Sequence, residues 1–317
     1  MIWLFLNLIC FRNLHQYLNL KKMKIILTGS LGNIGKPLTQ QLVQKGHQVT
    51  VISSNLEKIK TIENLGAVAA IGSLDNIDFL AKTFNGADVV YTMVPPNYFA
   101  EIDIREYYRK TGIIYKQALK QSGVKRVINL SSYGAHLDKG TGIILGSHFV
   151  EQTLNELSDV EITHIRPTYF YYNLLNLIQI IKNSGMIFAS YGGEKSFEMV
   201  SPIDIADAIV DEIEMPSTHR KVRYVSSDEL SGNEIATILG AKIGKPDLKW
   251  IVVSDEETRK GFLESGFPEQ LTNNYVEMFS SLNSGKLAEH YRLNKPAVLG
   301  KVKFSDFVAD FVSAYNS

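Results

Sequence analysis

The chain has 317 residues, of which 45% are apolar and 21% are charged. This composition excludes a disordered, collagen-like or disulfide-rich protein and is typical of a globular chain with one large core or two smaller ones. Lysine plus arginine equals aspartate plus glutamate at 33 each, so no excess positive charge is present to attract a phosphate backbone or an anionic membrane. We therefore expect neither nucleic acid nor a membrane as a partner.

The N-terminal segment contains Cys10, the chain's one cysteine. A single cysteine cannot form a disulfide within the chain, which favours a reducing compartment, and we predict a cytoplasmic protein. The first 22 residues hold an apolar run too short to cross a membrane, and they lack the basic start and small-residue cleavage site of a secretory signal. We predict that residues 1–22 are an extension outside the fold and that Met23 is the working start.

From Met23 onward, runs rich in valine and isoleucine alternate with helical segments. Helices include long ones at about 104–122 and 144–157, and strands are predicted at KIILTG, HQVTVIS, AVAAIG, ADVVYTM, RVINLSS and EITHIRP. Ser54 and Glu57 are predicted to form a capping box at the start of the helix after the second strand. This alternation is typical of a parallel sheet with helices on both faces. We predict an α/β fold, a Rossmann-type doubly wound parallel sheet formed by residues 23–167.

The alternation fades after Pro167. Helices are predicted near 203–214, 233–243 and 304–315, among aromatic and glycine-rich segments. Two short strand-like runs, KVRYVSS and LKWIVVS, could return to the edge of the first sheet. We expect residues 168–317 to form a smaller substrate lobe that packs tightly on the first domain, because no linker-like stretch separates the two.

The strongest chemical signal is TGSLGNIG, between the first strand and its helix. Its glycines have the spacing of a dinucleotide-binding loop, in which the first allows a tight turn, the second lets the backbone approach a pyrophosphate, and the third lets the helix pack closely. The helix N-terminus adds N–H donors for the anion. The alternative is a glycine turn that binds nothing. We predict a dinucleotide site formed by Thr28, Gly29, Leu31, Gly32, Asn33, Ile34 and Gly35.

The end of the second strand bears on which dinucleotide is bound. Proteins selective for NAD(H) place an acidic residue there, about 20 residues beyond the loop. This chain has Ser53, Ser54 and Asn55 instead, followed by Lys58. No carboxylate is present to repel a 2′-phosphate, and these four residues could bind one, so we predict NADP(H), with NAD(H) as the alternative. It is equally open that Ser54 only caps a helix and that Lys58 only faces water.

These motifs resemble the short-chain dehydrogenase/reductase superfamily, and within it the atypical NmrA-like branch of quinone reductases, isoflavone-reductase-like enzymes and NADP-sensing regulators. The resemblance covers roughly residues 24–317 and rests on TGSLGNIGKPL, VINLSS, HIRPTYFYYN and MVSPIDIADAIVDEI. It implies that the helix beginning near Asp204 supports the substrate lobe. It also implies cofactor contacts at the adenine from Gly72, Ser73 and Leu74, and at the ribose and nicotinamide from Met93, Val94, Pro95 and Ser131. The alternative for the segment at 93–96 is a strand end and a proline-stopped loop.

Typical members of this superfamily transfer hydride with a serine and with a tyrosine and lysine spaced four residues apart on the helix after the fifth strand. Ser132 matches the serine, but Ile143 and Ser147 stand at the tyrosine and lysine positions. Neither can relay a proton, which argues against epimerase or alcohol dehydrogenase chemistry. Tyr133 and His148 are the other candidate proton donors. Tyr133 follows Ser132 on a strand whose neighbours point to opposite faces, and His148 could equally be a packing histidine.

The function that fits these residues is NAD(P)H-dependent reduction of a quinone or a similar planar acceptor, which can take hydride without strong acid catalysis. The alternative is a non-catalytic NADP(H)-sensing regulatory protein. We predict no metal site, and a monomer or a homodimer. Aromatic residues could line an apolar pocket for a planar molecule, or could be core and nothing more. The predicted pocket residues are Pro167, Tyr169, Phe170 and Asn173.

Overall fold

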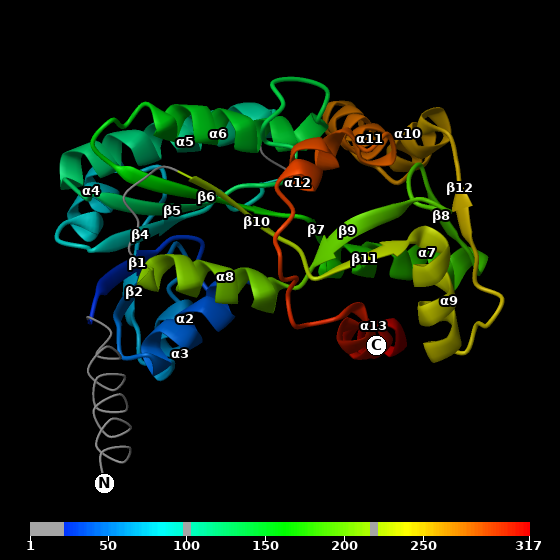
Figure 1. The fold of residues 1–317 in the computed structure, drawn as a ribbon, viewed down its shortest axis with the longest axis horizontal. Helices are drawn as coiled ribbons and strands as arrows, with labels where there is room; N and C mark the ends of the chain where they lie inside the picture. Colours follow the sequence, from blue (N-terminus) through cyan, green and yellow to red (C-terminus); the bar gives the residue numbers. More distant parts are fainter. Residues whose placement is uncertain (1–21, 98–102, 216–220) are drawn as a thin grey trace, which may run out of the picture.

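The structure is a computed structural model that describes residues 22–97, 103–215 and 221–317 (Figure 1). The predicted N-terminal extension lies outside the described residues except for Lys22.

Seven parallel strands form the central sheet, in the order β10-β6-β5-β4-β1-β2-β3. The bounds of these strands are β1 Lys24–Leu27, β2 Gln48–Ser53, β3 Val68–Ile71, β4 Val89–Thr92, β5 Arg126–Leu130, β6 Glu161–Pro167 and β10 Lys221–Val225. The predicted Rossmann-type sheet is confirmed. Because β1 pairs with β2 on one side and β4 on the other, the strand order reverses between β1 and β4. Ligands of such sheets bind beyond the carboxyl ends of the strands at this switch point.

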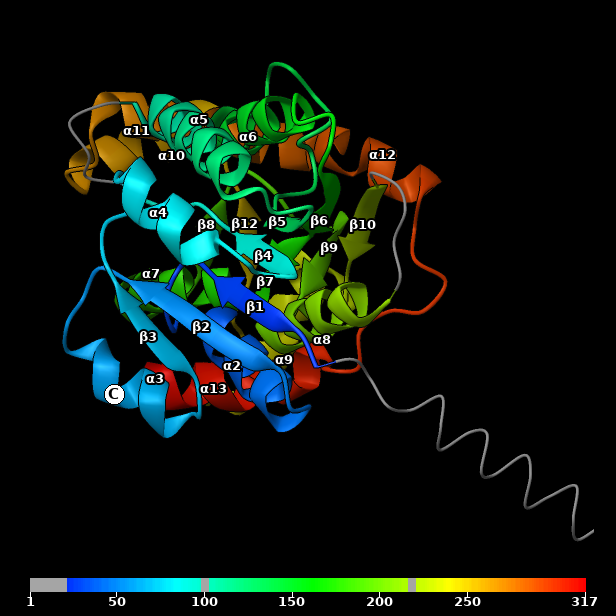
Figure 2. The ribbon, with the colours of Figure 1, turned by 90° about the vertical axis from the view of Figure 1, so that its left-hand side faces the viewer.

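Helices cover both faces of the central sheet (Figures 1 and 2). One face carries α4 Ile77–Phe84, α5 Ile104–Ser122 and α6 Leu145–Asn155, and the other carries α2 Gly35–Gln44, α3 Lys58–Asn64 and α8 Pro202–Glu214. Side chains alternate along each buried strand, so neighbouring residues belong to different cores. Ile128 of β5 packs in the α2 and α8 layer, whereas Val127 packs in the α4 to α6 layer.

The C-terminal half builds a lobe around two small sheets. One has the order β11-β9-β7 and the other pairs β12 with β8. The strands are β7 Tyr169–Phe170, β8 Ile187–Ala189, β9 Ser196–Val200, β11 Asp228–Ser231 and β12 Trp250–Val252. The helical segments are η1 Gly142–Ile144, η2 Tyr171–Leu177, α7 Ile178–Ser184, α9 Gly232–Lys242, α10 Asp255–Glu264, α11 Glu269–Asn283, η3 Lys286–Ala288, α12 Glu289–Leu293 and α13 Phe304–Asn316.

The two strand-like runs of the C-terminal half behave differently. KVRYVSS contains β10, which pairs in parallel with β6 at the edge of the central sheet. LKWIVVS contains β12, which pairs with β8 inside the lobe instead. Trp250 explains the difference, because its ring packs against Tyr191 and Phe197 in the aromatic core of the lobe. Helix α8 and strand β10 therefore lie with the first half of the chain in space, although they follow Pro167 in sequence.

Asp204, in the first turn of α8, ties the lobe to the central sheet. Its carboxylate accepts the N–H of Lys301 at 2.9 Å, the N–H of Val302 at 3.1 Å and the hydroxyl of Ser227 at 2.6 Å. A Cβ added at Gly300 would lie 2.2 Å from the Asp204 carboxylate, so this approach requires glycine. The contacts support the role that the resemblance implies for this helix.

The predicted capping box of Ser54 and Glu57 is wrong. Helix α3 begins at Lys58, and its N-cap Glu57 makes no side-chain capping bond. Asn55 Oδ1 accepts the N–H of Glu57 at 2.8 Å instead. Asparagine side chains commonly accept the N–H two residues further on, as Asn55 does here. The Ser54 side chain is exposed at the end of β2.

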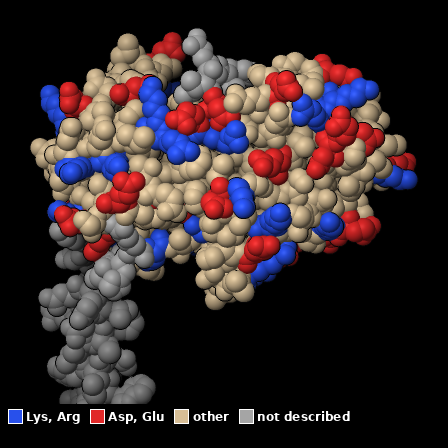
Figure 3. Space-filling view, turned by 90° about the horizontal axis from the view of Figure 1, so that it is seen from above, with Lys and Arg blue, Asp and Glu red and all other residues tan. Residues whose placement is uncertain are grey.

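Charge is evenly mixed over the face of the molecule that carries α5 and α6. Figure 3 shows lysine and arginine interspersed with aspartate and glutamate there, without a large area of one sign. Among the helices of the described residues, none combines the length with the apolar character that crossing a bilayer demands.

Candidate functional site

The three glycines of the loop after β1 have different surroundings. Gly29 has a φ of +88°, and a Cβ there would lie 2.3 Å from Met93 Sδ. A Cβ at Gly35 would lie 2.2 Å from the carbonyl oxygen of Ser30. At Gly32 the nearest atom to an added Cβ is 4.0 Å away, and the residue is exposed. The fold itself therefore requires the first and third glycines, while the open space at Gly32 is what an approaching anion needs.

Helix α2 begins directly after this loop without a side-chain cap, and its Lys36 N–H donates to the Gly32 carbonyl at 3.0 Å. Its N-cap, Ile34, provides no side-chain hydrogen bond, so the first-turn N–H groups have no capping side chain. Leu31 is half-buried, and Gly32 and Asn33 are exposed. A helix N-terminus with open backbone in front of it binds phosphate readily, and the residues present fit the pyrophosphate of a dinucleotide.

Ser53 holds the loop rather than facing solvent. Ser30 has a φ of +58°, donates its N–H to the carbonyl of Ile52 at 3.0 Å and donates its hydroxyl to Ser53 Oγ at 3.1 Å. The buried Ser53 hydroxyl also accepts the N–H of Asn55 at 3.2 Å. The Ser53 side chain is therefore engaged within the fold, whereas Ser54, Asn55 and Lys58 are exposed, and their contact with a 2′-phosphate stays a prediction.

The ends of β1 and β4 are locked together by Thr28 and Tyr115. Thr28 Oγ1 accepts the N–H of Met93 at 3.0 Å, and the hydroxyl of Tyr115 donates to the Met93 carbonyl at 2.7 Å. Burial raises the pKa of Tyr115, which keeps this phenol a donor. Thr28 is buried and its side chain is engaged within the fold, and a contact of this residue with the cofactor stays a prediction.

The predicted cofactor residues thus divide by exposure. Those that are at least partly exposed are Gly29, Leu31, Gly32, Asn33, Ser54, Asn55, Lys58, Gly72, Ser73, Leu74, Met93 and Pro95. Those that are buried are Thr28, Ile34, Gly35, Ser53, Val94 and Ser131. The exposed set surrounds the switch point at the ends of β1 to β4, and its contacts with a dinucleotide remain a prediction.

Ser131, at the end of β5, is engaged by a buried ion pair. Its hydroxyl donates to Glu151 Oε1 at 2.5 Å. Arg166 donates to both oxygens of the same carboxylate, at 2.8 and 2.5 Å. The direct cofactor contact that we predicted for the Ser131 side chain is therefore not supported, because its hydroxyl points to α6.

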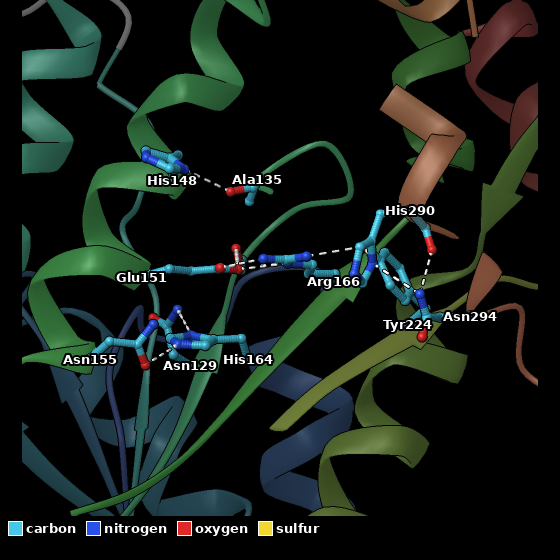
Figure 4. A network of polar contacts seen from close by, with 11 residues as sticks. Asn129, Ala135, His148, Glu151, Asn155, His164, Arg166, Tyr224, His290 and Asn294 are labelled. Carbon is cyan, nitrogen blue, oxygen red and sulfur yellow. Dashed lines mark hydrogen bonds and ion pairs between the residues drawn. The ribbon is translucent and has the colours of Figure 1, made fainter. Parts of the chain in front are cut away.

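Figure 4 shows the row of polar side chains that α6 presents to the sheet, formed by His148, Glu151 and Asn155. Their spacing of three and four residues places them on one helix face. Asn155 Oδ1 lies 3.2 Å from His164 Nε2, and His164 Nδ1 lies 3.1 Å from Asn129 Nδ2. Each member of the row therefore contacts a different part of the sheet or of the loop after it.

His148 and Tyr133, the two candidate proton donors, differ in their surroundings. His148 Nδ1 donates to the Ala135 carbonyl at 2.9 Å, so Nε2 is the ring nitrogen that can act toward a substrate. Tyr133 lies in the apolar core of the lobe, where its hydroxyl has no hydrogen-bond partner among the described residues. Burial raises the pKa of Tyr133 well above its usual value. The structure does not support the catalytic role that we predicted for Tyr133.

The predicted aromatic pocket residues also separate. Tyr169 is buried, and its hydroxyl lies 2.9 Å from that of Tyr191 in the lobe core. Phe170 is half-buried and stacks on Tyr172, with ring centroids 5.0 Å apart and planes 25° apart. Pro167 is buried, and Asn173 is half-buried. Tyr169 therefore packs as a core residue of the lobe, and a pocket lined by Phe170 and Asn173 stays a prediction.

Sequence reasoning missed several residues that hold the site together. Glu151, Tyr115, Tyr224 and His290 were not singled out, because their partners are distant in sequence and no motif marks them. Glu151 carried one signal, since a carboxylate on the sheet-facing side of a buried helix requires a cationic partner.

A Rossmann-type sheet with an anion-ready loop at its switch point defines a nucleotide-binding α/β protein. The model of the NmrA-like family matches residues 21–305, and the chain belongs to that family.

Several proteins are similar to this chain. An NAD(P)H azoreductase of Xenophilus azovorans is 24% identical over 259 residues, which cover 81% of this chain and 86% of the relative. The structure of an NADPH-dependent quinone oxidoreductase of Escherichia coli, complexed with NADPH, has a TM-score of 0.76 at 18% identity and covers 90% of this chain and 99% of that one. A Citrobacter triphenylmethane reductase complexed with NADP(H) has a TM-score of 0.74 at 19% identity, with the same coverage.

Proposed function

We propose that this protein is an NADPH-dependent reductase that transfers hydride directly to a planar, electron-poor acceptor such as a quinone or a conjugated dye. One observation carries the proposal. The open anion cradle at Gly32 is combined with Ile143 and Ser147 where a proton-relaying tyrosine and lysine would stand. The names of the relatives add support, since they are reductases of azo, quinone and triphenylmethane compounds.

The exposed residues at the switch point would hold the cofactor. Backbone N–H groups at residues 31–34 suit the pyrophosphate, and Ser54, Asn55 and Lys58 suit a 2′-phosphate. When bound, the cofactor supplies the hydride. Lys58 adds a positive charge where an NAD(H)-selective protein would have a carboxylate, which favours NADPH.

The acceptor would lie between the end of β5 and the aromatic pair of Phe170 and Tyr172. A planar conjugated molecule stacks well on such rings. Its developing negative charge is delocalised, so a hydrogen bond from Ser132 is sufficient help, and solvent supplies the proton. A simple ketone lacks that delocalisation and would need the missing tyrosine.

The test is consumption of NADPH with quinones, azo dyes, triphenylmethane dyes and simple ketones. We expect turnover with the conjugated acceptors, none with ketones, and unchanged turnover in Tyr133→Phe. Robust ketone reduction would contradict direct hydride transfer. Binding of NADPH without consumption by any acceptor would instead favour an NADP(H)-sensing regulator. A cytoplasmic location remains part of the proposal and rests on the single cysteine.

A further inference from the structure

A buried chain of polar side chains runs from the end of β5 to α12 (Figure 4). It begins with the Ser131 hydroxyl on Glu151 and continues through the two bonds between Arg166 and that carboxylate. Arg166 Nη1 then donates to Tyr224 Oη at 3.1 Å, and Tyr224 Oη lies 2.8 Å from His290 Nδ1. Four separate elements, α6, β6, β10 and α12, are joined in this way to the residue before Ser132.

The hydrogen bonds of this chain have a defined direction. A guanidinium only donates, so Tyr224 Oη accepts from Arg166 and donates its own proton to His290 Nδ1. The Asn294 side-chain amide nitrogen also lies 3.2 Å from His290 Nδ1. His290 Nδ1 is therefore an acceptor. The chain is connected from Glu151 to His290.

Burial makes the chain difficult to rearrange. Glu151 is 2% exposed and Arg166 is 5% exposed, so neither charge can exchange its partner for water. Burial works against the charge of Arg166, but the hydrogen bonds that Arg166 donates to Glu151 and Tyr224, together with the negative charge of Glu151, outweigh it and raise the pKa of Arg166. A buried ion pair is stable only when its remaining hydrogen-bonding capacity is satisfied, and Ser131 and Tyr224 satisfy it here.

The direction of Ser132 follows from the anchoring of Ser131. Beyond β5 the backbone continues to bond to β6. The N–H of Ser131 donates to the carbonyl oxygen of Ile165 at 2.7 Å, and the N–H of Tyr133 donates to the carbonyl oxygen of Pro167 at 3.0 Å. Side chains therefore continue to alternate. Ser131 lies on the α6 face, so Ser132 falls on the other face of the sheet, which carries α2, α3 and α8.

We propose that Glu151 and Arg166 are positioning residues, which hold Ser131 on α6 and thereby direct Ser132 toward the nicotinamide side of the switch point. Tyr224 and His290 extend this support to α12 of the lobe. The inference rests on the proposed function, because that function makes Ser132 the hydrogen-bond donor to the acceptor, and Glu151 and Arg166 are inferred to position Ser132. No contact of Glu151 or Arg166 with substrate is required.

The experiment compares Ser131→Ala, which leaves the ion pair intact, with Ser190→Ala. Ser190 is a matched control, since it is buried and its Oγ has no partner among the described residues. We expect kcat for a quinone to fall about tenfold in Ser131→Ala, a modest cost for misplacing a reacting group, with KM for NADPH unchanged. Ser190→Ala should keep the kcat of the parent protein. Glu151→Gln should resemble Ser131→Ala if it folds.

A second readout does not depend on turnover. The fluorescence of bound NADPH reports the surroundings of the nicotinamide, and we expect it to change in Ser131→Ala but not in Ser190→Ala. Parent-like kcat and fluorescence in Ser131→Ala would overturn the positioning role. A parent protein that binds NADPH but reduces no acceptor would overturn the proposed reductase alone, since the fluorescence comparison would still test the direction of Ser132.

Discussion

The glycine loop and the polar row of α6 serve the same sheet but are built in opposite ways. The loop offers backbone groups in open space, and the nearest atom to a Cβ added at Gly32 is the Gly29 carbonyl oxygen, 4.0 Å away. The row consists of paired side chains, of which Glu151 is buried against Arg166 while His148 and Asn155 are half-buried. A change at Gly32 should therefore alter binding without altering folding, whereas a change in the row should alter stability first.

Breaking the ion pair between Arg166 and Glu151 should have the largest effect, which is on the free energy of unfolding. Arg166→Met leaves the Glu151 carboxylate buried without its cation, and we expect a loss of about 3–5 kcal/mol in the free energy of unfolding. The double variant Glu151→Leu/Arg166→Met removes both charges and should regain most of that loss. Denaturant unfolding gives the free energy of unfolding of the parent, of Arg166→Met and of the double variant. A double variant as unstable as Arg166→Met would show that packing, rather than an unpaired charge, accounts for the loss.

The loop is tested by Gly32→Val, which should leave the unfolding free energy close to that of the parent. The new side chain would occupy the space for the pyrophosphate. Loss of two charge-assisted hydrogen bonds, at about 1.5–3 kcal/mol each, corresponds to a roughly 100-fold or greater weakening of NADPH binding. Calorimetry gives the affinity. Gly261→Val on α10 is the matched control, because it also has open space around it and should bind NADPH normally. Unchanged affinity in a folded Gly32→Val protein would refute the loop assignment.

The end of β2 offers a smaller and selective change. Ser54→Asp places a carboxylate at an exposed position, where it should repel a 2′-phosphate and accept a ribose hydroxyl. We expect about tenfold weaker NADPH binding, equivalent to about 1.4 kcal/mol, and tighter NADH binding. Gln44→Asp adds the same charge at the opposite end of α2 and should change neither. Tighter NADH than NADPH binding by the parent protein would contradict the predicted cofactor preference.

Replacing His136 should have the smallest effect on stability, and the size of that effect should depend on pH. Neither of its ring nitrogens has a hydrogen-bond partner among the described residues, and its ring centroid lies 5.3 Å from that of His290. Burial, followed by the charges of Arg166 and His290, lowers the pKa of His136, while Glu289 and Glu151 act in the opposite direction.

The sign of this pH dependence follows from proton linkage. The unfolded chain, with a histidine pKa of about 6.5, binds a proton that the folded His136 does not. The stability contribution is therefore complete above about pH 6.5 and is lost as the pH falls toward the lower folded-state pKa. His136→Phe keeps a ring beside His290, and its melting temperature should fall less than that of the parent between neutral and mildly acid pH. If the melting temperatures of His136→Phe and of the parent fell in parallel with pH, the lowered pKa of His136 would not be the cause of the pH dependence.

Much of the fold could be predicted because its signals are local. Alternating apolar runs and helical segments identified the six strands before Pro167 and the long helices, and α5 has the bounds that the sequence predicted. The glycine spacing identified the loop. LKWIVVS could not be placed, because its partner β8 is a three-residue strand with no pattern of its own.

The site was harder to predict because it depends on which groups already have partners. Ser53, Thr28 and Ser131 have the right chemistry and the right position along the chain, yet each is engaged within the fold. Tyr133 fails for a related reason, since the turn after β5 delivers its ring into the lobe core. Such pairings are tertiary. A single sequence cannot reveal them.

The contacts of Asp204 have a consequence for how the chain reaches its native state. Its partners Lys301 and Val302 are 97 and 98 residues further along, and β10, the seventh strand of the sheet, follows α8 in the chain. A chain that emerges from the ribosome N-terminus first thus holds six strands with an unfinished edge while most of the lobe is still being made. Contacts of such long sequence separation slow folding and expose strand edges to other chains. Nascent chains that stop before residue 300 would lack the hydrogen bonds from Lys301 and Val302 to Asp204 of α8.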